Sequence, residues 1–189
     1  MLPIFSVTAE SNFSSLLPMR IRPATVADIS ELLVLIHQKA AFDGCPQAVK
    51  ATAEKLEATL FSPSPMAHVL LVESLEHTST PPMGFASYHF TYSTFLAQPS
   101  LWLDDLFVQS DYRNQSIGTH LIQSLCKIVQ QHDCGRIDWT VDVDNAAGIR
   151  FYQRMGGQLQ TQVHLCRLNQ SGIEAVLQER KLAASTLSQ

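Results

Sequence analysis

The sequence predicts an α/β or α+β domain built around a mixed β-sheet. Two segments with helical spacing come first, an antiparallel meander of strands follows, and a strand–helix–strand–helix–strand run ends near residue 168. Alternation of this kind is typical of a sheet covered by helices. With 189 residues, of which 46% are hydrophobic and 16% charged, the chain can form one globular domain with a substantial core.

The first half of the chain predicts one strand and two helices. Met19–Arg22 is the strand, and Thr25–Asp28 resembles a capping box in which Asp replaces the usual Glu. We expect the helix behind it to end near Asp43–Gly44. A second helix is predicted over Thr52–Leu60, where the Ser-Pro-Ser-Pro run at 62–65 breaks it. Apolar residues at helical spacing mark the first helix: Ile29, Leu32, Leu33, Ile36 and Ala40.

Strands and helices alternate in the second half. The predicted elements are strands at His68–Glu73, Gly84–Tyr92 and Leu101–Val108, a helix at Ile117–Gln131, a strand at Arg136–Val141, a helix at Asn145–Met155 and a last strand at Val163–Leu168. The polar, Pro-rich loop 76–82 predicts that the first two of these strands pair antiparallel. We expect a single domain over 19–180, between a flexible N-terminal arm (1–18) and a C-terminal tail (181–189).

Composition excludes several classes of function. The formal net charge of −4 and the lack of a Lys/Arg stripe argue against nucleic acid. No apolar run approaches the roughly 20 residues of a membrane span, and the first residues make a poor signal peptide, so we expect a cytoplasmic protein. The four cysteines form no C-x-x-C pair and the seven histidines have no metal spacing; no metal is expected. His89 and His164 are interpreted as strand-face residues.

The turn Tyr112–Gly118 is the strongest functional signal. It lies between an apolar strand and a helix that starts at once. A turn that leads into a helix N-terminus offers unpaired N–H donors and the positive end of the helix dipole, so it can hold a diphosphate. A nucleotide-binding α/β domain is disfavoured, because neither G-x-G-x-x-G nor a Lys-containing phosphate loop occurs.

Taken in order, the motifs resemble those of the GCN5-related N-acetyltransferase (GNAT) superfamily, and within it the diamine (spermidine/spermine) acetyltransferase branch. The matching segments span about residues 19–170: Ile21–Thr25, Ala27-Asp28, Gly84–Ala86, Phe90–Tyr92, Leu103–Val108, Asp111–Arg113, Ile117-Gly118, Asn145 and Phe151-Tyr152. The resemblance implies a mixed, mostly antiparallel sheet with a splayed strand pair, acetyl-CoA as co-substrate between those strands, and a homodimer.

The resemblance also implies a set of CoA-binding residues. They are the main chain of Leu106, Phe107 and Val108 for the pantetheine, the turn residues Arg113, Asn114, Gln115, Ser116, Ile117, Gly118 and Thr119 for the diphosphate, and Asn145. Ser116 stands where the family pattern has its first glycine, and many relatives have glycine at Asn114. Because a Cβ hinders close phosphate approach, we expect weaker CoA binding, with loss of binding as the alternative. Asn145 can also cap its own helix.

Acetyl transfer to an amine requires a neutral amine, donors for the oxyanion and a proton for the departing thiolate. The resemblance assigns Tyr152 as the general acid; the alternative is an ordinary buried aromatic. A main-chain N–H near Phe107 or Val108 would serve the oxyanion. Asp104 would accept the amine proton through water or hold the substrate ammonium, and a carboxylate on a buried strand can have a raised pKa. Alternatively, Asp104 and Asp105 face opposite sides of their strand and only one pairs locally.

The resemblance assigns Phe42 and Asp43 to the acceptor pocket, with Asp104, Asp138 and Trp139 as further candidates. An aromatic face beside a carboxylate suits an alkylammonium group, although Phe42 and Asp43 could equally be helix-end residues. The leading hypothesis is an acetyl-CoA-dependent N-acetyltransferase that acts on a primary amine of a polyamine, a diamine or a lysine-like amino acid. The alternatives are a non-catalytic acyl-CoA-binding module and an acetyltransferase for protein or peptide amines.

Overall fold

The computed structural model describes residues 18–76 and 80–186, with side chains up to residue 178. Its backbone forms two compact units, the first ending at Asp142 and the second beginning at Val143, and each is described by itself. The predicted arm at 1–18 lies, apart from Pro18, outside the described residues. The single-domain arrangement of 19–180 stays a prediction.

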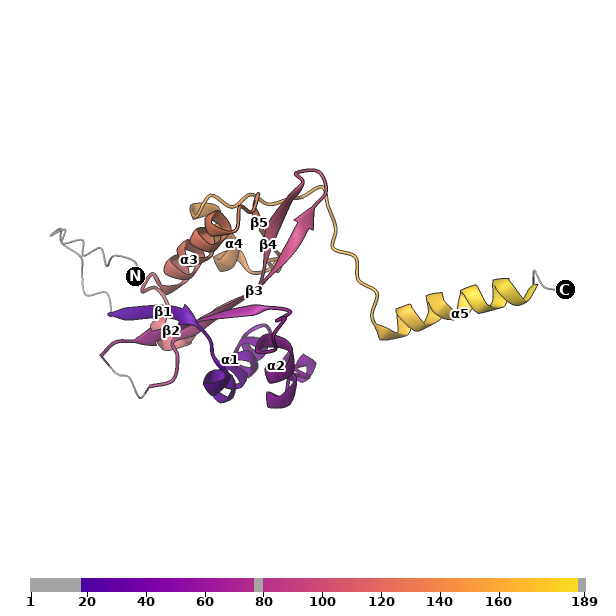
Figure 1. Cartoon of the computed structure of the whole chain (residues 1–189). Helices are drawn as coiled ribbons and strands as arrows, with labels where there is room; N and C mark the ends of the chain where they lie inside the picture. The colour runs from indigo at the N-terminus through magenta and orange to yellow at the C-terminus, as the bar shows by residue number, and fades with distance from the viewer. Residues whose placement is uncertain (1–17, 77–79, 187–189) are drawn as a thin grey trace. The chain divides into compact units, whose positions relative to one another are not determined.

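The first unit is built on a five-stranded sheet with the strands in chain order (Figure 1). The first four strands pair antiparallel, and the fifth pairs parallel with the fourth. The strands are β1 (Met19–Pro23), β2 (His68–Ser74), β3 (Gly84–Ser93), β4 (Gln98–Val108) and β5 (Ile137–Trp139). A parallel pair requires a crossover connection, which here contains helix α3 (Ile117–Gln131). The predicted mixed sheet is confirmed.

Helices cover both faces of this sheet: α1 (Ile29–Phe42) and α2 (Ala53–Leu60) lie on one face and α3 on the other (Figure 1). The cluster beneath α1 consists of Leu32, Leu35, Val69, Leu71, Phe85 and Phe107. Helix α3 buries Ile117, Leu121, Ile122 and Leu125. The helical spacing in the sequence predicted most of the α1 face, because side chains three and four residues apart share one side of a helix. Ile29, Leu32 and Ala40 are buried as expected, whereas Leu33 and Ile36 are half-buried and the buried Leu35 was not predicted.

Most element boundaries follow the local chemistry. The capping box of Thr25 and Asp28 is present, although it opens a 3-10 turn before α1 begins. Helix α1 ends at Phe42, and Gly44 takes a φ of 74°, which suits glycine after a helix. Thr52 caps α2, because its hydroxyl accepts a hydrogen bond from the N–H of Lys55. Strand β5 is shorter than the predicted Arg136–Val141.

The second unit contains α4 (Ala146–Arg154) and α5 (Gln170–Thr186). The strand predicted over Val163–Leu168 is wrong: these residues have no regular structure, and their side chains are exposed. An alternating apolar pattern makes a segment able to form a strand, but the strand forms only where another strand pairs with it. No strand is described within this unit. Helix α5 was not predicted and overlaps the expected tail; Asn169 caps its start by accepting from the N–H of Gly172.

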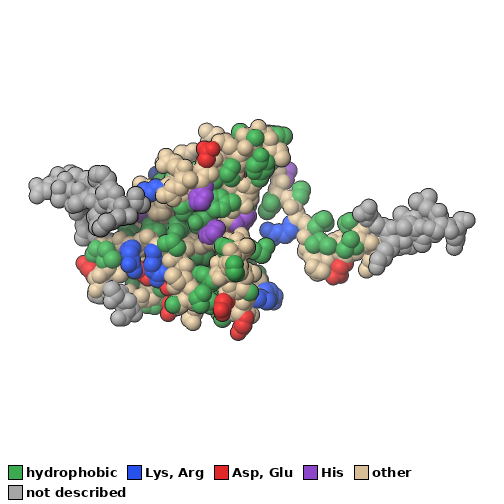
Figure 2. All heavy atoms as spheres, in the orientation of Figure 1, with side chains coloured by type: hydrophobic (Ala, Val, Ile, Leu, Met, Phe, Trp, Pro, Cys, Tyr) green, Lys and Arg blue, Asp and Glu red, His purple; other side chains and the backbone are tan. Residues whose placement is uncertain are grey.

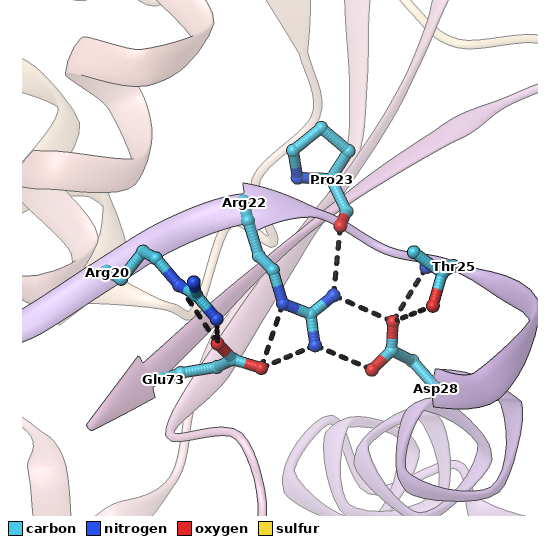
Figure 3. Close-up of polar contacts among 6 residues, drawn as sticks. All are labelled: Arg20, Arg22, Pro23, Thr25, Asp28 and Glu73. Atoms are coloured by element: carbon cyan, nitrogen blue, oxygen red, sulfur yellow. Dashed lines mark hydrogen bonds and ion pairs between the residues drawn. The ribbon is translucent and has the colours of Figure 1, made fainter. Parts of the chain in front are cut away.

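An ion-pair network joins β1, β2 and the start of α1 (Figure 3). The Arg22 guanidinium donates to both carboxylate oxygens of Asp28 at 2.7 Å and also binds Glu73, to which Arg20 donates as well. The hydrogen bond from Arg22 lowers the pKa of Asp28 far below its usual range, against the opposing effect of burial, and Thr25 adds to this lowering. Arg22 likewise lowers the pKa of Glu73.

Replacing Asp28 with Asn should reduce the free energy of unfolding at pH 7 by about 1–2 kcal/mol, because the amide keeps a capping oxygen but loses the charge that pairs with Arg22. A carboxyl whose folded-state pKa is lowered stabilises the protein above its unfolded pKa of about 4 and loses this effect as the pH falls further. The difference between Asp28→Asn and the parent protein should therefore shrink from pH 7 to pH 3 in urea unfolding. Glu57→Gln, which likewise turns a carboxylate into an amide but at an exposed position, is the control. An undiminished difference at pH 3 would contradict this account.

Candidate functional site

A β-bulge in β4 organises the candidate site. Gly84 to Ser87 of β3 pair in register with Val108 to Asp105 of β4, but the next residue, Tyr88, pairs with Leu103. Asp104 is therefore an extra residue on β4, with no residue of β3 paired opposite it. One extra residue bends a strand and disturbs the ladder locally.

The bulge places both acidic side chains of the pair on one face of the sheet. Asp105 Oδ2 accepts from the Ser87 hydroxyl at 3.1 Å, and Asp104 Oδ2 lies 2.9 Å from His89 Nδ1. Ser87 and His89 are two residues apart on β3 and so share a face. The alternative that Asp104 and Asp105 face opposite sides is wrong, because it assumes regular alternation. Nor is Asp104 buried, since its side chain is 44% exposed.

Helix α1 brings a lysine to the same carboxylates. Lys39 Nζ forms ion pairs with Asp43, one helical turn further on, and with Asp105 Oδ1 at 3.2 Å. The Lys39 side chain is only 22% exposed. Burial acts to lower the pKa of Lys39, but the two carboxylates outweigh it and raise that pKa above its ordinary value. This face of the sheet thus holds a primary ammonium between carboxylates of α1 and β4.

Arg113 joins the end of α1 to the end of β4. Its guanidinium carbon lies 4.4 Å from the Phe42 ring centroid and 5.8 Å from that of Phe107. Its Nε donates to the carbonyl of Val108 at 3.0 Å. A guanidinium at this distance from an aromatic ring is attracted by the ring's quadrupole. The structure therefore brings the predicted acceptor residue Phe42 together with the predicted CoA-binding residue Arg113.

Strand β4 loses its second neighbour at the bulge. Its pairing with β5 covers three residues and ends where Leu103 meets Trp139, whereas β4 continues to Val108. Within the described part of the first unit, the stretch from Asp105 to Val108 therefore pairs with β3 alone. This is the geometry expected for the splayed strand pair.

The free edge of β4 presents main-chain groups at alternate residues. The N–H of Gln109, just after β4, donates to the carbonyl of Met83, just before β3, at 3.0 Å. Because bonding alternates along an antiparallel pair, the main-chain groups of Leu106 and Val108 turn toward the opposite edge. Unpaired N–H and C=O groups at such an edge are obligatory hydrogen-bonding groups that a ligand can satisfy.

The turn before α3 adopts glycine-like backbone conformations without glycine. Asn114 and Ser116 both have a φ of 61°, in the left-handed region. Asparagine visits this region readily, whereas for serine it costs roughly 1 kcal/mol. The Ser116 side chain makes no capping hydrogen bond to the first turn of α3. The backbone thus takes, at these two positions, conformations that glycine adopts freely, with the strain concentrated at Ser116.

The remaining predicted residues lie elsewhere. Asp138 on β5 accepts from Arg136 Nε at 2.7 Å, so its carboxylate is engaged by its own strand, and Trp139 is half-buried at the end of that strand. In the second unit, Asn145 caps α4 by accepting from the N–H of Gly148 at 2.8 Å, which confirms its capping role. The half-buried Tyr152 has its ring centroid 5.2 Å from that of Phe151. The roles of Asn145 and Tyr152 toward the first unit stay predictions.

Sequence reasoning missed three side chains of this site: Lys39, Ser87 and His89. For Lys39 a signal was available, because a lysine four residues before Asp43 on a helix is placed to pair with it. Ser87 lies directly opposite Asp105, so its contact follows from the strand register, which the sequence does not specify. His89 gains its partner Asp104 only through the bulge, and a bulge leaves no mark in the pattern of apolar residues.

Other classes of site find no support in the described residues. Those residues include no group of three or more His, Cys, Asp or Glu that could hold a metal ion. None of the described helices is long and apolar enough to cross a membrane. On the face shown in Figure 2, Lys and Arg side chains lie in small separate groups, not in the continuous basic surface typical of nucleic-acid binding.

Comparison with known proteins agrees with the fold. Thialysine N-epsilon-acetyltransferase of Mus musculus is 29% identical over 143 residues, which cover 74% of this chain and 84% of the mouse protein. L-ornithine N5-acetyltransferase of Arabidopsis thaliana is 27% identical over 198 residues, which cover 83% of this chain and 87% of the plant protein. A Vibrio cholerae integron cassette protein has the same fold, with a TM-score of 0.68 and 22% identity over 84% of this chain and 97% of that one.

The family model described as "Acetyltransferase (GNAT) family" matches residues 31–157, which are more than half of the chain and include the bulge, the turn and α4. This chain therefore belongs to the GNAT family of acetyltransferases and is an N-acetyltransferase.

Proposed function

We propose that this enzyme transfers the acetyl group of acetyl-CoA directly to a primary amine of a small cationic acceptor: a polyamine, a diamine or a lysine-like amino acid. The curated relatives named above act, by their names, on thialysine and ornithine, both of which carry a side-chain amine. The observation that carries the proposal is the Lys39 ammonium held by Asp43 and Asp105, because it supports an affinity of this face for a primary ammonium.

The residues proposed to bind acetyl-CoA fit it in two respects. The open edge of β4 offers main-chain groups of Leu106 and Val108 that suit the amides of a pantetheine arm, whereas the same alternation turns the main-chain groups of Phe107 toward β3. The turn from Arg113 to Thr119 leads into α3 with left-handed residues at Asn114 and Ser116, a backbone course that suits a diphosphate. When bound, acetyl-CoA supplies the activated acyl group and the thiol leaving group. Asn145 would add a contact besides its capping role.

The acceptor amine must lose a proton before it attacks. We propose that Asp104 either accepts the amine proton or binds the substrate ammonium. Because Asp104 contacts His89, the His89 ring is a second candidate for the proton acceptor. With an ionised Asp104 bound to Nδ1 of the ring, the Nε2 of His89 is the nitrogen that remains to take a proton. Phe42 and Asp43 would position the alkylammonium, with Asp138 and Trp139 as further candidates on β5. Tyr152 would donate its hydroxyl proton to the departing thiolate.

Two features of the proposed enzyme rest on the family resemblance and on composition alone. A homodimer is expected from the resemblance. A cytoplasmic location is expected from the sequence, in which no apolar run approaches the length of a membrane span.

Replacing Tyr152 with Phe should lower kcat by about 100-fold, the usual contribution of one general acid, while the KM for acetyl-CoA changes little. The measurement is amine-dependent thiol release from acetyl-CoA with a panel of diamines, polyamines and basic amino acids. Tyr92→Phe removes the same hydroxyl from an exposed tyrosine at the end of β3 and should leave kcat unchanged. Acetyl-CoA binding without turnover of any amine would remove the proposed acceptor class, and full activity of Tyr152→Phe would remove its role as acid.

Replacing Ser116 with Gly should raise the free energy of unfolding by up to about 1 kcal/mol, because glycine adopts a positive φ without the clash of a Cβ. Binding of CoA, followed by calorimetry, should tighten several-fold if the turn holds the diphosphate. Ser124→Gly makes the same chemical change inside α3 and should instead destabilise the protein by about 0.5–1 kcal/mol. Unaltered CoA affinity in a stabilised Ser116→Gly variant would place the diphosphate elsewhere.

A further inference from the structure

We propose that Lys39 sets the acceptor specificity: its ammonium occupies part of the acidic site, so the enzyme prefers acceptors with a single net positive charge over diamines and polyamines. The inference rests on the proposed function and narrows it. It assigns to Lys39, a residue outside the proposed catalytic set, the role of a specificity determinant.

The first step is the placement of Lys39. Its Nζ pairs with Asp43 on the same helix and with Asp105 on β4, and Asp105 also accepts from Ser87. A partly buried ammonium between two carboxylates stays protonated. An incoming alkylammonium must therefore displace Lys39 from these carboxylates or share them with it.

The second step is the charge that remains for a substrate. On this face lie three carboxylates, of Asp43, Asp104 and Asp105, and two permanent cations, Lys39 and Arg113. With His89 neutral, these groups leave one net negative charge. Arg113 also stacks against Phe42, so the aromatic face predicted to receive an alkylammonium already has a cation of the chain beside it.

The third step follows from complementarity. A site with one net negative charge matches an acceptor with one net positive charge. Each further ammonium group of an acceptor would be repelled by Lys39 and Arg113, with no additional carboxylate of the site to compensate. A basic amino acid meets this condition, because its own carboxylate cancels one of its two ammonium groups. A diamine or a polyamine does not.

The test compares two acceptors that share one carbon chain. L-ornithine is 1,4-diaminobutane with a carboxylate at one end, so the pair differs in net charge and little else. The parent enzyme should have the higher kcat/KM for ornithine. In Lys39→Met, which keeps the length of the side chain but removes its charge, the ratio of the two kcat/KM values should move about tenfold toward 1,4-diaminobutane.

Three further variants separate this effect from others. Lys127→Met makes the same charge change at an exposed position on α3 and should leave the ratio unchanged. Lys39→Gln repeats the test with a polar side chain, in case the methionine variant unfolds, which thermal unfolding reports. Lys39→Met combined with Asp105→Asn restores the net charge of the site and should return the ratio toward that of the parent.

Calorimetric titration of the same two amines makes the test independent of turnover. Tighter binding of 1,4-diaminobutane to Lys39→Met than to the parent protein, with little change for ornithine, supports the inference even if no amine is acetylated; in that case the proposed function fails alone. An unchanged ratio of kcat/KM and unchanged affinities in both Lys39 variants overturn the inference and leave the proposed function standing. Failure of both amines to bind overturns the inference as well.

Discussion

The single extra residue in β4 is the constraint on which the candidate site depends. Without it, Asp104 and Asp105 would alternate across the sheet, and only one of them could lie on the face that α1 covers. With it, Asp105 reaches Lys39 and Ser87 while Asp104 reaches His89 on the same face. The ladder with β5 also ends at this point, so one local irregularity produces both the acidic face and the open strand edge.

The site is preorganised by cations that belong to the chain itself. Lys39 keeps the carboxylates of Asp43 and Asp105 apart and oriented, and Arg113 ties the carbonyl of Val108 to the ring of Phe42. The Lys39 ammonium thus offsets the mutual repulsion of the two carboxylates that it binds. The same contacts link α1, β4 and the turn before α3.

Much of the first unit could be predicted from the sequence, because its elements have clear periodicity and clear ends. The predicted bounds of α3 agree with the structure, and α1 ends where Asp43-Gly44 indicated. The predicted family and the mixed sheet are confirmed by the family match and the strand order. The facing of Asp104 could not be predicted, because bulges change which face a residue occupies without changing its neighbours in sequence.

The second unit illustrates the opposite limit. Val163 and Leu165 alternate as strand residues do, yet a strand exists only through a partner, and no partner is described within that unit. Helix α5 follows Asn169, a capping residue whose signal is clear only once the competing strand interpretation is set aside. Pairing between segments far apart in the sequence is the information that a local pattern lacks.

The network around Arg22 has a consequence for self-association. Strand β1 is an edge strand of the described sheet. An edge strand presents unpaired N–H and C=O groups with which another chain can pair. Here that strand carries two arginines held by Glu73, and it closes with Pro23, which has no N–H to offer. Charge and proline together discourage a second copy from adding a strand along β1, which favours a different surface for the proposed homodimer.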